Sequence, residues 1–272
     1  MKKTADTGIT YPTFVLRTGE LALRFLELNG QYGRFVWAVL CRTLTPPWRL
    51  RAVAEQCIVI GIRSLPIAVL TSIFVGMVMV LQTGVQLAKF GAKGYVPGIS
   101  FIANAREMVP AFVAIVVGAR VAASITAEIG TMKVTEQLDA MDTLNVDPVR
   151  YLAVPRLIAM TVMLPLISAL CLVTGFLGGM VVGATSLNID PLSYYHITLR
   201  FAYLEDVYGG LFKTIIFGMI IALTGCFYGF FTSGGAAGVG RATTNSVVST
   251  LILILIFDYI LTTWILIVTG VA

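Results

Sequence analysis

Five long apolar stretches alternate with shorter polar segments along this chain. They run from Ser64 to Ala88, Met108 to Ala127, Leu157 to Thr185, Thr214 to Thr232 and Ser246 to Val268. Each matches or exceeds the roughly 20 residues that a helix needs to cross a bilayer, and none carries more than one charged residue. The pattern predicts an all-α, polytopic membrane protein with about five transmembrane helices. Arg63 and Pro66, close to the start of the first stretch, leave open that this one is partly re-entrant.

A polar segment from Thr131 to Arg156 separates the second and third stretches. Its apolar positions recur at spacings of four, three and three residues, as on one face of a helix, at Val134, Leu138, Met141 and Leu144. Asn145 ends the pattern, and Asp147-Pro148 is typical of an N-cap followed by a proline at the first helical position. We therefore predict a short amphipathic helix over about residues 131–146 and a second helix directly after it. By pattern alone, a linker helix lying on the membrane surface explains this segment equally well.

Two further segments are predicted to lie along the membrane surface. From Thr13 to Leu44, polar residues recur every three or four positions, at Arg17, Glu20, Arg24, Glu27, Gln31 and Arg34. A basic amphipathic helix of this kind lies in the interface plane. The aromatic segment 188–208, which opens with Asp190-Pro191, is typical of a helix on the outer surface. The predicted organisation is thus an N-terminal cytoplasmic or interfacial segment over residues 1–63 and a transmembrane domain over residues 64–272.

Composition and charge support a membrane protein and give it an orientation. Hydrophobic residues make up 57% of the chain and charged residues 12%, against about 25% charged in soluble domains. The net charge of +5 is spread along the membrane flanks, which favours positive-inside topology over nucleic-acid binding. The N-terminal region, residues 129–156 and Arg241 fall on one side; Lys89, Lys93, Arg200 and Lys213 fall on the other. The N-terminus is therefore predicted inside and the C-terminus outside.

No pattern in the chain predicts a catalytic or metal site. The four cysteines lack CxxC spacing, and His196 is the only histidine. There is no GxxxxGK[ST] motif, so ATP hydrolysis on this chain is not expected. The glycines of residues 233–245 predict a cytoplasmic turn. Lys2 and Lys3 lead into a polar segment and not into the apolar core of a signal peptide.

Two charged residues lie inside predicted spans, namely Arg120 and Asp258. Such residues usually face the interior of a bundle and pair, so we predict an Arg120–Asp258 ion pair. The alternative is that Arg120 extends toward Glu128 or a lipid phosphate while Asp258 stays protonated.

Three segments carry a resemblance to a known family. They are AEIGTMKVTEQLDAMDTLNVDPVRYLAVPR, which ends at Arg156, GGAAGVGRATTNSVV from Gly234 to Val248, and the weaker VGMVMVLQ from Val75 to Gln82. Together they resemble the MlaE/YrbE family, the permease subunits of ABC transporters that work with MCE proteins, over roughly Ser64 to the C-terminus. The resemblance implies that the polar segment is a coupling helix that docks on a cytoplasmic ATPase. Its expected coupling residues are Glu136, Gln137, Asp139, Asp147 and Arg150.

The resemblance also implies a lipid cavity. Arg106 and Glu107 stand in REMVP where the family has RELGP, so the charged pair matches while Met108-Val109 departs from the motif. By similarity, Met79, Leu87 and Phe90 line the cavity beside that pair. The implied protein is a homodimer in a bacterial inner membrane that holds a phospholipid or a similar molecule. Its implied partners are two ATPase subunits that carry ATP and Mg, a periplasmic MCE ring and, as a further candidate, a STAS-domain protein; no cofactor is expected on this chain.

Two other functions remain open at this stage. A proton-coupled secondary transporter would use Asp258 and Glu107 as proton carriers, although it would not need the coupling-helix signature. A membrane scaffold without transport would need no paired charges inside the spans.

Overall fold

The computed structural model describes residues 13–46 and 49–268, with side chains from residue 23 onward except residues 24 and 25. Within these ranges the chain is helical throughout, apart from short turns, and contains no strand. The chain divides between Pro46 and Pro47 into two units. Helix α1 (Thr13–Leu44) makes up the first and is unbroken. The amphipathic helix predicted there is present, but the side chains of Arg17, Glu20 and Arg24 lie outside the described residues.

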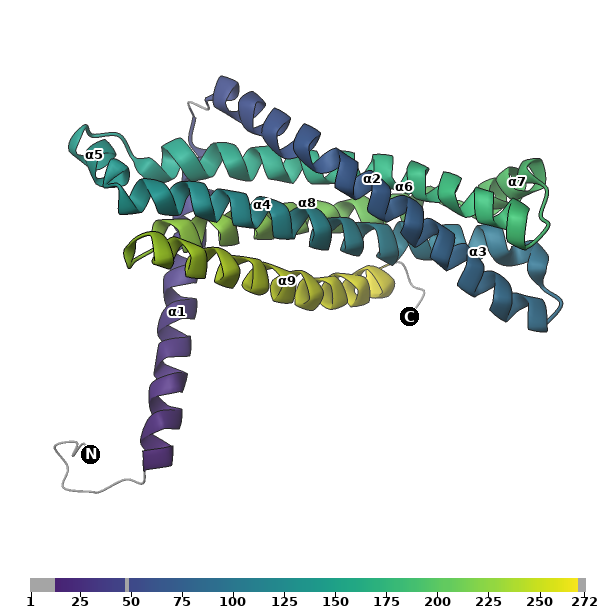
Figure 1. Ribbon diagram of the computed structural model, residues 1–272, viewed down its shortest axis with the longest axis horizontal. Coiled ribbons are helices and arrows are strands. Elements are labelled where there is room, and N and C mark those ends of the chain that lie inside the picture. The colour runs from purple at the N-terminus through teal and green to yellow at the C-terminus, as the bar shows by residue number, and fades with distance from the viewer. Residues whose placement is uncertain (1–12, 47–48, 269–272) are drawn as a thin grey trace. The chain divides into compact units, whose positions relative to one another are not determined.

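The second unit contains five helices that are long and apolar enough to cross a membrane, which confirms the all-α polytopic class. They are α2 (Leu50–Lys89), α4 (Val109–Val134), α6 (Val154–Ser186), α8 (Leu204–Phe230) and α9 (Gly235–Val268). Figure 1 shows α4, α6, α8 and α9 running alongside one another, with α2 crossing them at an angle.

Short helices connect the spans at the two ends of this unit (Figure 1). The segment α5 (Gln137–Thr143) and the π-helix η3 (Val149–Ala153) join α4 to α6, at what we call the α5 end. At the opposite, α7 end, α7 (Pro191–Phe201) joins α6 to α8. A 3-10 turn η1 (Lys93–Tyr95), α3 (Val96–Ala103) and a second π-helix η2 (Asn104–Met108) lead from α2 into α4.

Three spans begin ten or more residues earlier in the chain than the sequence pattern predicts. Helix α2 starts at Leu50 rather than Ser64, so Pro66 lies inside it and does not open it. A proline is tolerated there because neighbouring helices and side chains in a membrane bundle compensate the freed backbone groups. Helix α8 starts at Leu204 and therefore includes Lys213. The predicted turn over 233–245 is also mostly helical, since α9 starts at Gly235 and only Gly234 and Gly235 take positive φ.

Close packing of α2 on α6 depends on glycine. A Cβ atom on Gly76 would lie 2.0 Å from the carbonyl oxygen of Gly175, and one on Gly178 would lie 2.6 Å from the carbonyl oxygen of Ile73. Backbones can approach this closely only where side chains are absent. The small-residue patch of α6 therefore packs against α2 within the chain.

Helix α7 is held against α6 by one buried aromatic residue. The Asp190 carboxylate accepts a hydrogen bond from the Ser193 N–H at 3.0 Å and caps α7, as the sequence predicts. Tyr194, which is 2% exposed, packs in a cluster with Val80 and Leu187. Burial raises the pKa of Tyr194 to about 12, so its hydroxyl stays neutral.

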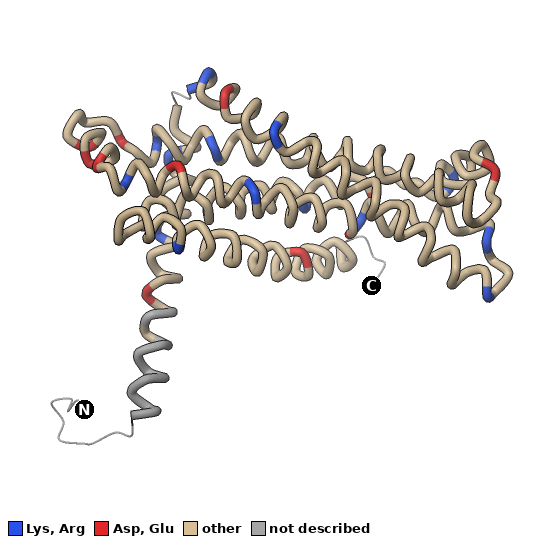
Figure 2. The backbone as a smooth tube through the Cα atoms, in the orientation of Figure 1, with Lys and Arg blue, Asp and Glu red and all other residues tan. Residues whose placement is uncertain are grey.

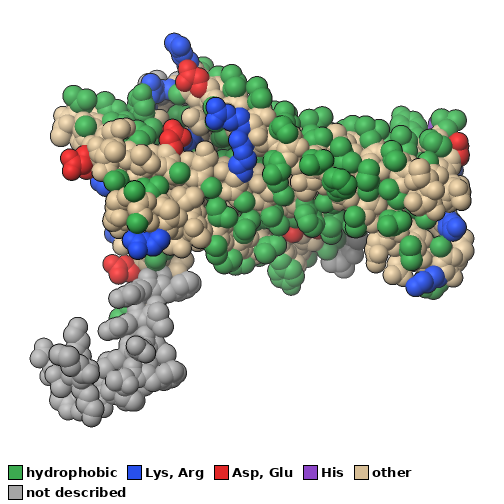
Figure 3. Space-filling view, viewed as in Figure 1, with side chains coloured by type: hydrophobic (Ala, Val, Ile, Leu, Met, Phe, Trp, Pro, Cys, Tyr) green, Lys and Arg blue, Asp and Glu red, His purple; other side chains and the backbone are tan. Residues whose placement is uncertain are grey.

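Charged residues concentrate toward the two ends of the second unit (Figure 2). Hydrophobic side chains cover much of the surface between these ends in the view of Figure 3. This distribution suits a bundle whose middle lies in a bilayer and whose ends lie in water. The few charges along the middle of the spans therefore need a specific explanation.

Candidate functional site

A buried lysine forms the centre of a polar cluster near the α7 end. Lys213 of α8 is 2% exposed, and its Nζ lies 2.7 Å from Oε1 of Glu107 and 3.4 Å from Oδ1 of Asp258. The same Nζ donates to the Thr262 hydroxyl at 2.7 Å and to the Arg106 carbonyl at 3.1 Å. Both carboxylates are partly exposed, Glu107 by 33% and Asp258 by 20%. The lysine charge is thus compensated by two carboxylates from two other helical segments.

The π-helix η2 places Arg106 and Glu107 against α8. The Val109 N–H bonds to the Asn104 carbonyl, five residues back, as in a π-turn. Such a turn widens the helix and redirects side chains, and π-turns are frequent at functional sites. Gly210 permits the contact, because a Cβ atom there would lie 2.0 Å from the Ala105 carbonyl oxygen.

A second ion pair lies beside the lysine cluster. Nε of Arg106 donates to Oδ1 of Asp206 at 2.5 Å; the arginine side chain is 41% exposed and the aspartate 3%. The other carboxylate oxygen of Asp206 is buried and has no hydrogen-bond partner. Arg106 is therefore anchored at one nitrogen while the exposed part of its guanidinium remains available to an anion.

The two ion pairs border one small pocket. It offers about 50 Å³ of free volume and is lined by Arg106, Glu107, Glu205, Asp206, Gly209, Gly210, Lys213, Thr262, Ile265 and Leu266. The predicted site residues Arg106 and Glu107 thus come together here. Met79, Leu87 and Phe90 are absent from this lining. Leu87 instead packs beside the Tyr194 cluster, and Phe90 is 82% exposed.

The predicted coupling residues occupy the opposite, α5 end. The short helix covers only Gln137–Thr143, because α4 continues to Val134 and Glu136 adopts a left-handed φ of 60°. Lys133 Nζ pairs with Oδ1 of Asp139 at 2.8 Å across this break. Glu136 and Asp139 are both exposed.

The helix after α5 begins as the sequence predicts. Asn145 ends the turn with a φ of 58°. Oδ1 of Asp147 then accepts from the N–H groups of Val149 and Arg150, at 3.0 and 3.3 Å, which confirms Asp147 as the N-cap.

An ion pair closes the α4–α5–α6 segment. Nη2 of Arg156 lies 2.7 Å from Oε1 of Glu128, and Nη1 donates to the Leu152 carbonyl at 2.9 Å. Arg156 is 3% exposed and Glu128 is 55% exposed. The pair joins the last turns of α4 to the first turn of α6, so it holds together the two helices that carry α5.

The predicted Arg120–Asp258 pair is not present. Asp258 pairs with Lys213, and Nη1 of Arg120 donates instead to the Ser64 hydroxyl at 2.8 Å. Asp258 shares its lysine with Glu107, which precedes Arg120 by thirteen positions, or roughly 20 Å along a helix. Depth estimated from the ends of each span misplaced Asp258, because α9 starts eleven residues earlier than predicted.

Lys213, Asp206 and Thr262 were not identified from the sequence. The sequence pattern places Lys213 on the outer flank, because the uncharged apolar stretch starts at Thr214. A periodic signal was nevertheless present. Asp206 and Lys213 are seven residues apart and Asp258 and Thr262 four apart, so each pair lies on one face of its helix.

The five long apolar helices define a multi-pass membrane protein. A family model described as permease MlaE matches residues 53–264, and the chain therefore belongs to the MlaE permease family. It is 38% identical over 244 residues to a probable ABC transporter permease protein of Rickettsia typhi, covering 90% of this chain and 94% of that protein. It is 42% identical over 211 residues to a probable ABC transporter permease protein of Synechocystis, covering 78% and 80%. It is also 34% identical over 230 residues to the Arabidopsis thaliana protein TRIGALACTOSYLDIACYLGLYCEROL 1, chloroplastic, covering 83% and 65%.

Proposed function

We propose that this chain is the permease subunit of an ATP-driven lipid transporter that binds a phospholipid or a similar amphiphile. The observation that carries this proposal is the pocket at the α7 end, where fixed charges lie beside apolar helix surfaces. Arg106 offers a partly exposed guanidinium, while Ile265 and Leu266 form an apolar wall. Guanidinium groups recognise phosphate by charge-assisted, often bidentate hydrogen bonds. A headgroup at Arg106 with acyl chains along the apolar wall suits this arrangement.

A second copy of the chain is part of the proposal. The pocket of about 50 Å³ is far smaller than the 300–1,000 Å³ typical of ligand sites. Helix α9 supplies one wall and is the least buried of the five spans. In its most apolar stretch 11% of the residues are buried, against 72% in that of α8. A homodimer that uses this face of α9 would enlarge the pocket into a cavity.

The proposed partners follow from the family and from the two ends of the unit. Relatives named as ABC transporter permeases imply an ATPase partner, which we assign to the exposed polar face of α5 through Glu136, Gln137 and Asp139. With the α5 end cytoplasmic in a bacterial inner membrane, the α7 end faces the periplasm and an MCE ring. A STAS-domain protein bound to the ATPase is a further candidate. The name of the Arabidopsis relative includes that of a glycerolipid, trigalactosyldiacylglycerol. This supports lipid as the proposed substrate class.

The test is ATP-dependent lipid transfer by the reconstituted complex. The chain is co-purified with its ATPase, inserted into vesicles with a labelled phospholipid, and transfer to an acceptor is followed with and without ATP. Arg106→Gln should reduce transfer, while Arg200→Gln, an exposed arginine of α7 outside the pocket, should leave it unchanged. ATP-independent transfer, or equal transfer by both variants, would contradict the proposal.

A proton-coupled secondary transporter is the second candidate, because the structure brings Glu107 and Asp258 to one lysine. Proton carriers at this position would bind and release protons as Lys213 exchanges partners. The family counts against it, since its relatives are named ABC transporter permeases. Transport abolished by a protonophore but insensitive to vanadate would favour the proton-coupled mechanism over the ATP-driven one.

A further inference from the structure

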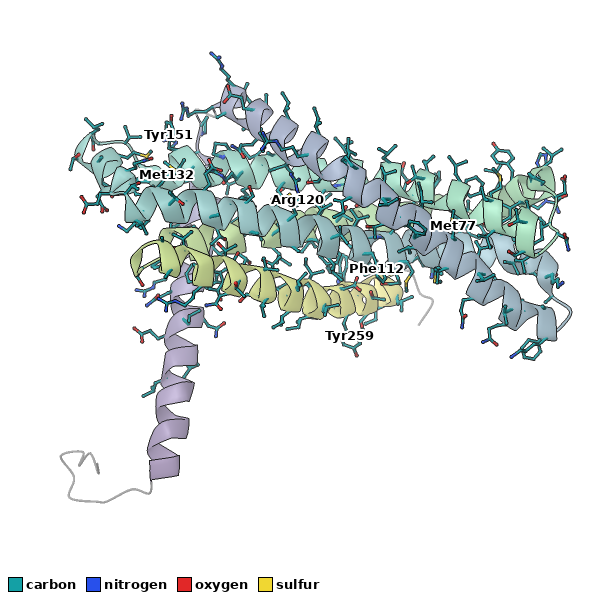
Figure 4. The ribbon with its side chains drawn as sticks, viewed as in Figure 1. Met77, Phe112, Arg120, Met132, Tyr151 and Tyr259 are labelled. Atoms are coloured by element: carbon teal, nitrogen blue, oxygen red, sulfur yellow. The ribbon has the colours of Figure 1, made fainter. Side chains whose placement is uncertain are left out.

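An arginine in the middle of a span is exposed on the surface of the second unit. Arg120 is eleven residues from the first residue of α4 and fourteen from the last. Its side chain is exposed, whereas Ser64, which accepts its hydrogen bond at 2.8 Å, is completely buried. Figure 4 shows Arg120 on the side of α4 that faces α2. The serine hydroxyl thus holds Nη1 of an arginine that is otherwise exposed, so further donors of its guanidinium can take a second partner.

Within the second unit, no carboxylate of the described residues lies at this depth. Glu107 is thirteen positions before Arg120, or roughly 20 Å toward the α7 end, by the helical rise. Asp258 lies level with Glu107, because both contact Lys213. Glu128 is eight positions after Arg120, roughly 12 Å toward the α5 end, and is paired with Arg156.

A second copy of this unit would not supply the missing anion either. In a two-fold dimer whose axis is the membrane normal, each residue keeps the depth that it has in the first copy. The partner's carboxylates would therefore lie at the same two levels, on either side of Arg120. An arginine inside a membrane is normally paired with an anion or set in a water-filled space, and neither this unit nor a copy of it brings a carboxylate to Arg120.

We propose that Arg120, held by Ser64, binds the phosphate of a phospholipid whose headgroup is drawn below the membrane surface from the α5 end, between α2 and α4. Phosphate suits the outward donors, because a guanidinium binds it through parallel charge-assisted hydrogen bonds. The long arginine side chain extends over part of the roughly 12 Å between Arg120 and the α5 end of the span. The lipid headgroup moves into the membrane over the remaining distance. The role of this site in transport rests on the proposed function, whereas lipid binding at Arg120 does not.

Headgroup-labelled lipid can detect this site without ATP or partner proteins. The probe is a phospholipid with a photoreactive diazirine on its headgroup, in phosphatidylcholine vesicles that contain the full chain. After illumination, adducts are mapped by mass spectrometry. We expect adducts on the middle of α2 and α4, around Ser64 and Arg120, in addition to those at the membrane surface. Arg120→Gln should lower the mid-membrane adducts roughly tenfold or more, as the loss of a charge-assisted hydrogen bond implies, while Arg120→Lys should retain a measurable part.

Matched variants and competitors determine what occupies the site. Arg63 is also exposed and lies one residue before Ser64 on α2, so Arg63→Gln controls for the general positive charge of this face and should leave the mid-membrane adducts unchanged. An equal loss in both variants would overturn a specific site at Arg120. Adducts displaced by inorganic phosphate alone would assign the site to a free anion. A wild-type chain without mid-membrane adducts would show that no headgroup reaches Arg120. Either result overturns the proposal. Because the assay needs no transport, its failure leaves the proposed function testable by itself.

Discussion

Replacing Lys213 by methionine tests the central cluster most directly. Methionine fills a similar volume without the charge. Glu107 and Asp258 therefore lose the cation that compensates them, and the Arg106 carbonyl loses its hydrogen-bond donor. Removing one partner of a buried ion pair costs about 3–5 kcal/mol, since the other charge is left uncompensated. The two carboxylates are 33% and 20% exposed, which lets water and protons relieve part of the repulsion. We therefore expect a loss near the lower end, about 3 kcal/mol.

The assay is the free energy of unfolding of the purified chain in mixed detergent micelles, titrated with dodecyl sulfate. Lys133→Met is the matched control, because Lys133 pairs with Asp139 at the surface, where the side chains are 36% and 57% exposed. Surface pairs contribute about 0–1 kcal/mol, so this control should unfold almost like the wild type.

A rescue variant separates charge compensation from simple packing. Adding Glu107→Gln and Asp258→Asn to Lys213→Met removes the two uncompensated carboxylates. The triple variant should therefore lose less unfolding free energy than the sum of the losses of the three single variants. The reasoning is refuted if Lys213→Met costs no more than Lys133→Met, or if the losses add without coupling.

Four further changes test other parts of the structure. Glu136→Lys with Asp139→Lys should abolish ATP-driven transport while the chain still inserts; normal ATPase binding and turnover in this variant would contradict the coupling assignment. Glu128→Ala should lower the unfolding free energy by about 1.5–3 kcal/mol, because Arg156 stays buried without its carboxylate; unchanged stability in the same detergent titration would show that the pair is not needed. Gly76→Ala should lower the free energy of unfolding by at least about 1–3 kcal/mol, since its Cβ would lie 2.0 Å from the Gly175 carbonyl oxygen. Gly94→Ala is the control, because a Cβ there meets nothing within 4 Å. Equal thermal stability of the two variants would contradict the packing of α2 on α6. A photo-crosslinker at Leu87 or Phe90 should capture lipid in membranes, and adducts confined to a control at the exposed Val162 of α6 would exclude these two residues from the lipid path.

The all-α class and the five spans were predictable because they depend on local sequence. Length and apolarity alone require a helix in a bilayer, where every backbone polar group must be satisfied internally. The same holds for the caps at Asp147 and Asp190, whose carboxylates bond to N–H groups two or three residues ahead. Helix bounds were less predictable. Polar and glycine-containing turns of α2, α8 and α9 continue helices whose stability comes from packing rather than from propensity.

The charge partners, in contrast, were decided by tertiary structure. The sequence shows that Arg106, Glu107, Arg120 and Asp258 lie in or near spans, but it does not give the rotation or depth of one helix relative to another. The π-turn at η2 and the absent side chain of Gly210 bring η2 against α8, so that Lys213, and not Arg120, lies within reach of Asp258. Segments more than a hundred residues apart meet at that lysine, and no local pattern specifies such a contact. The sequence therefore determined the spans and the position of Arg120 and Asp258 within them, whereas helix packing determined that Lys213 pairs with Asp258 and Glu107.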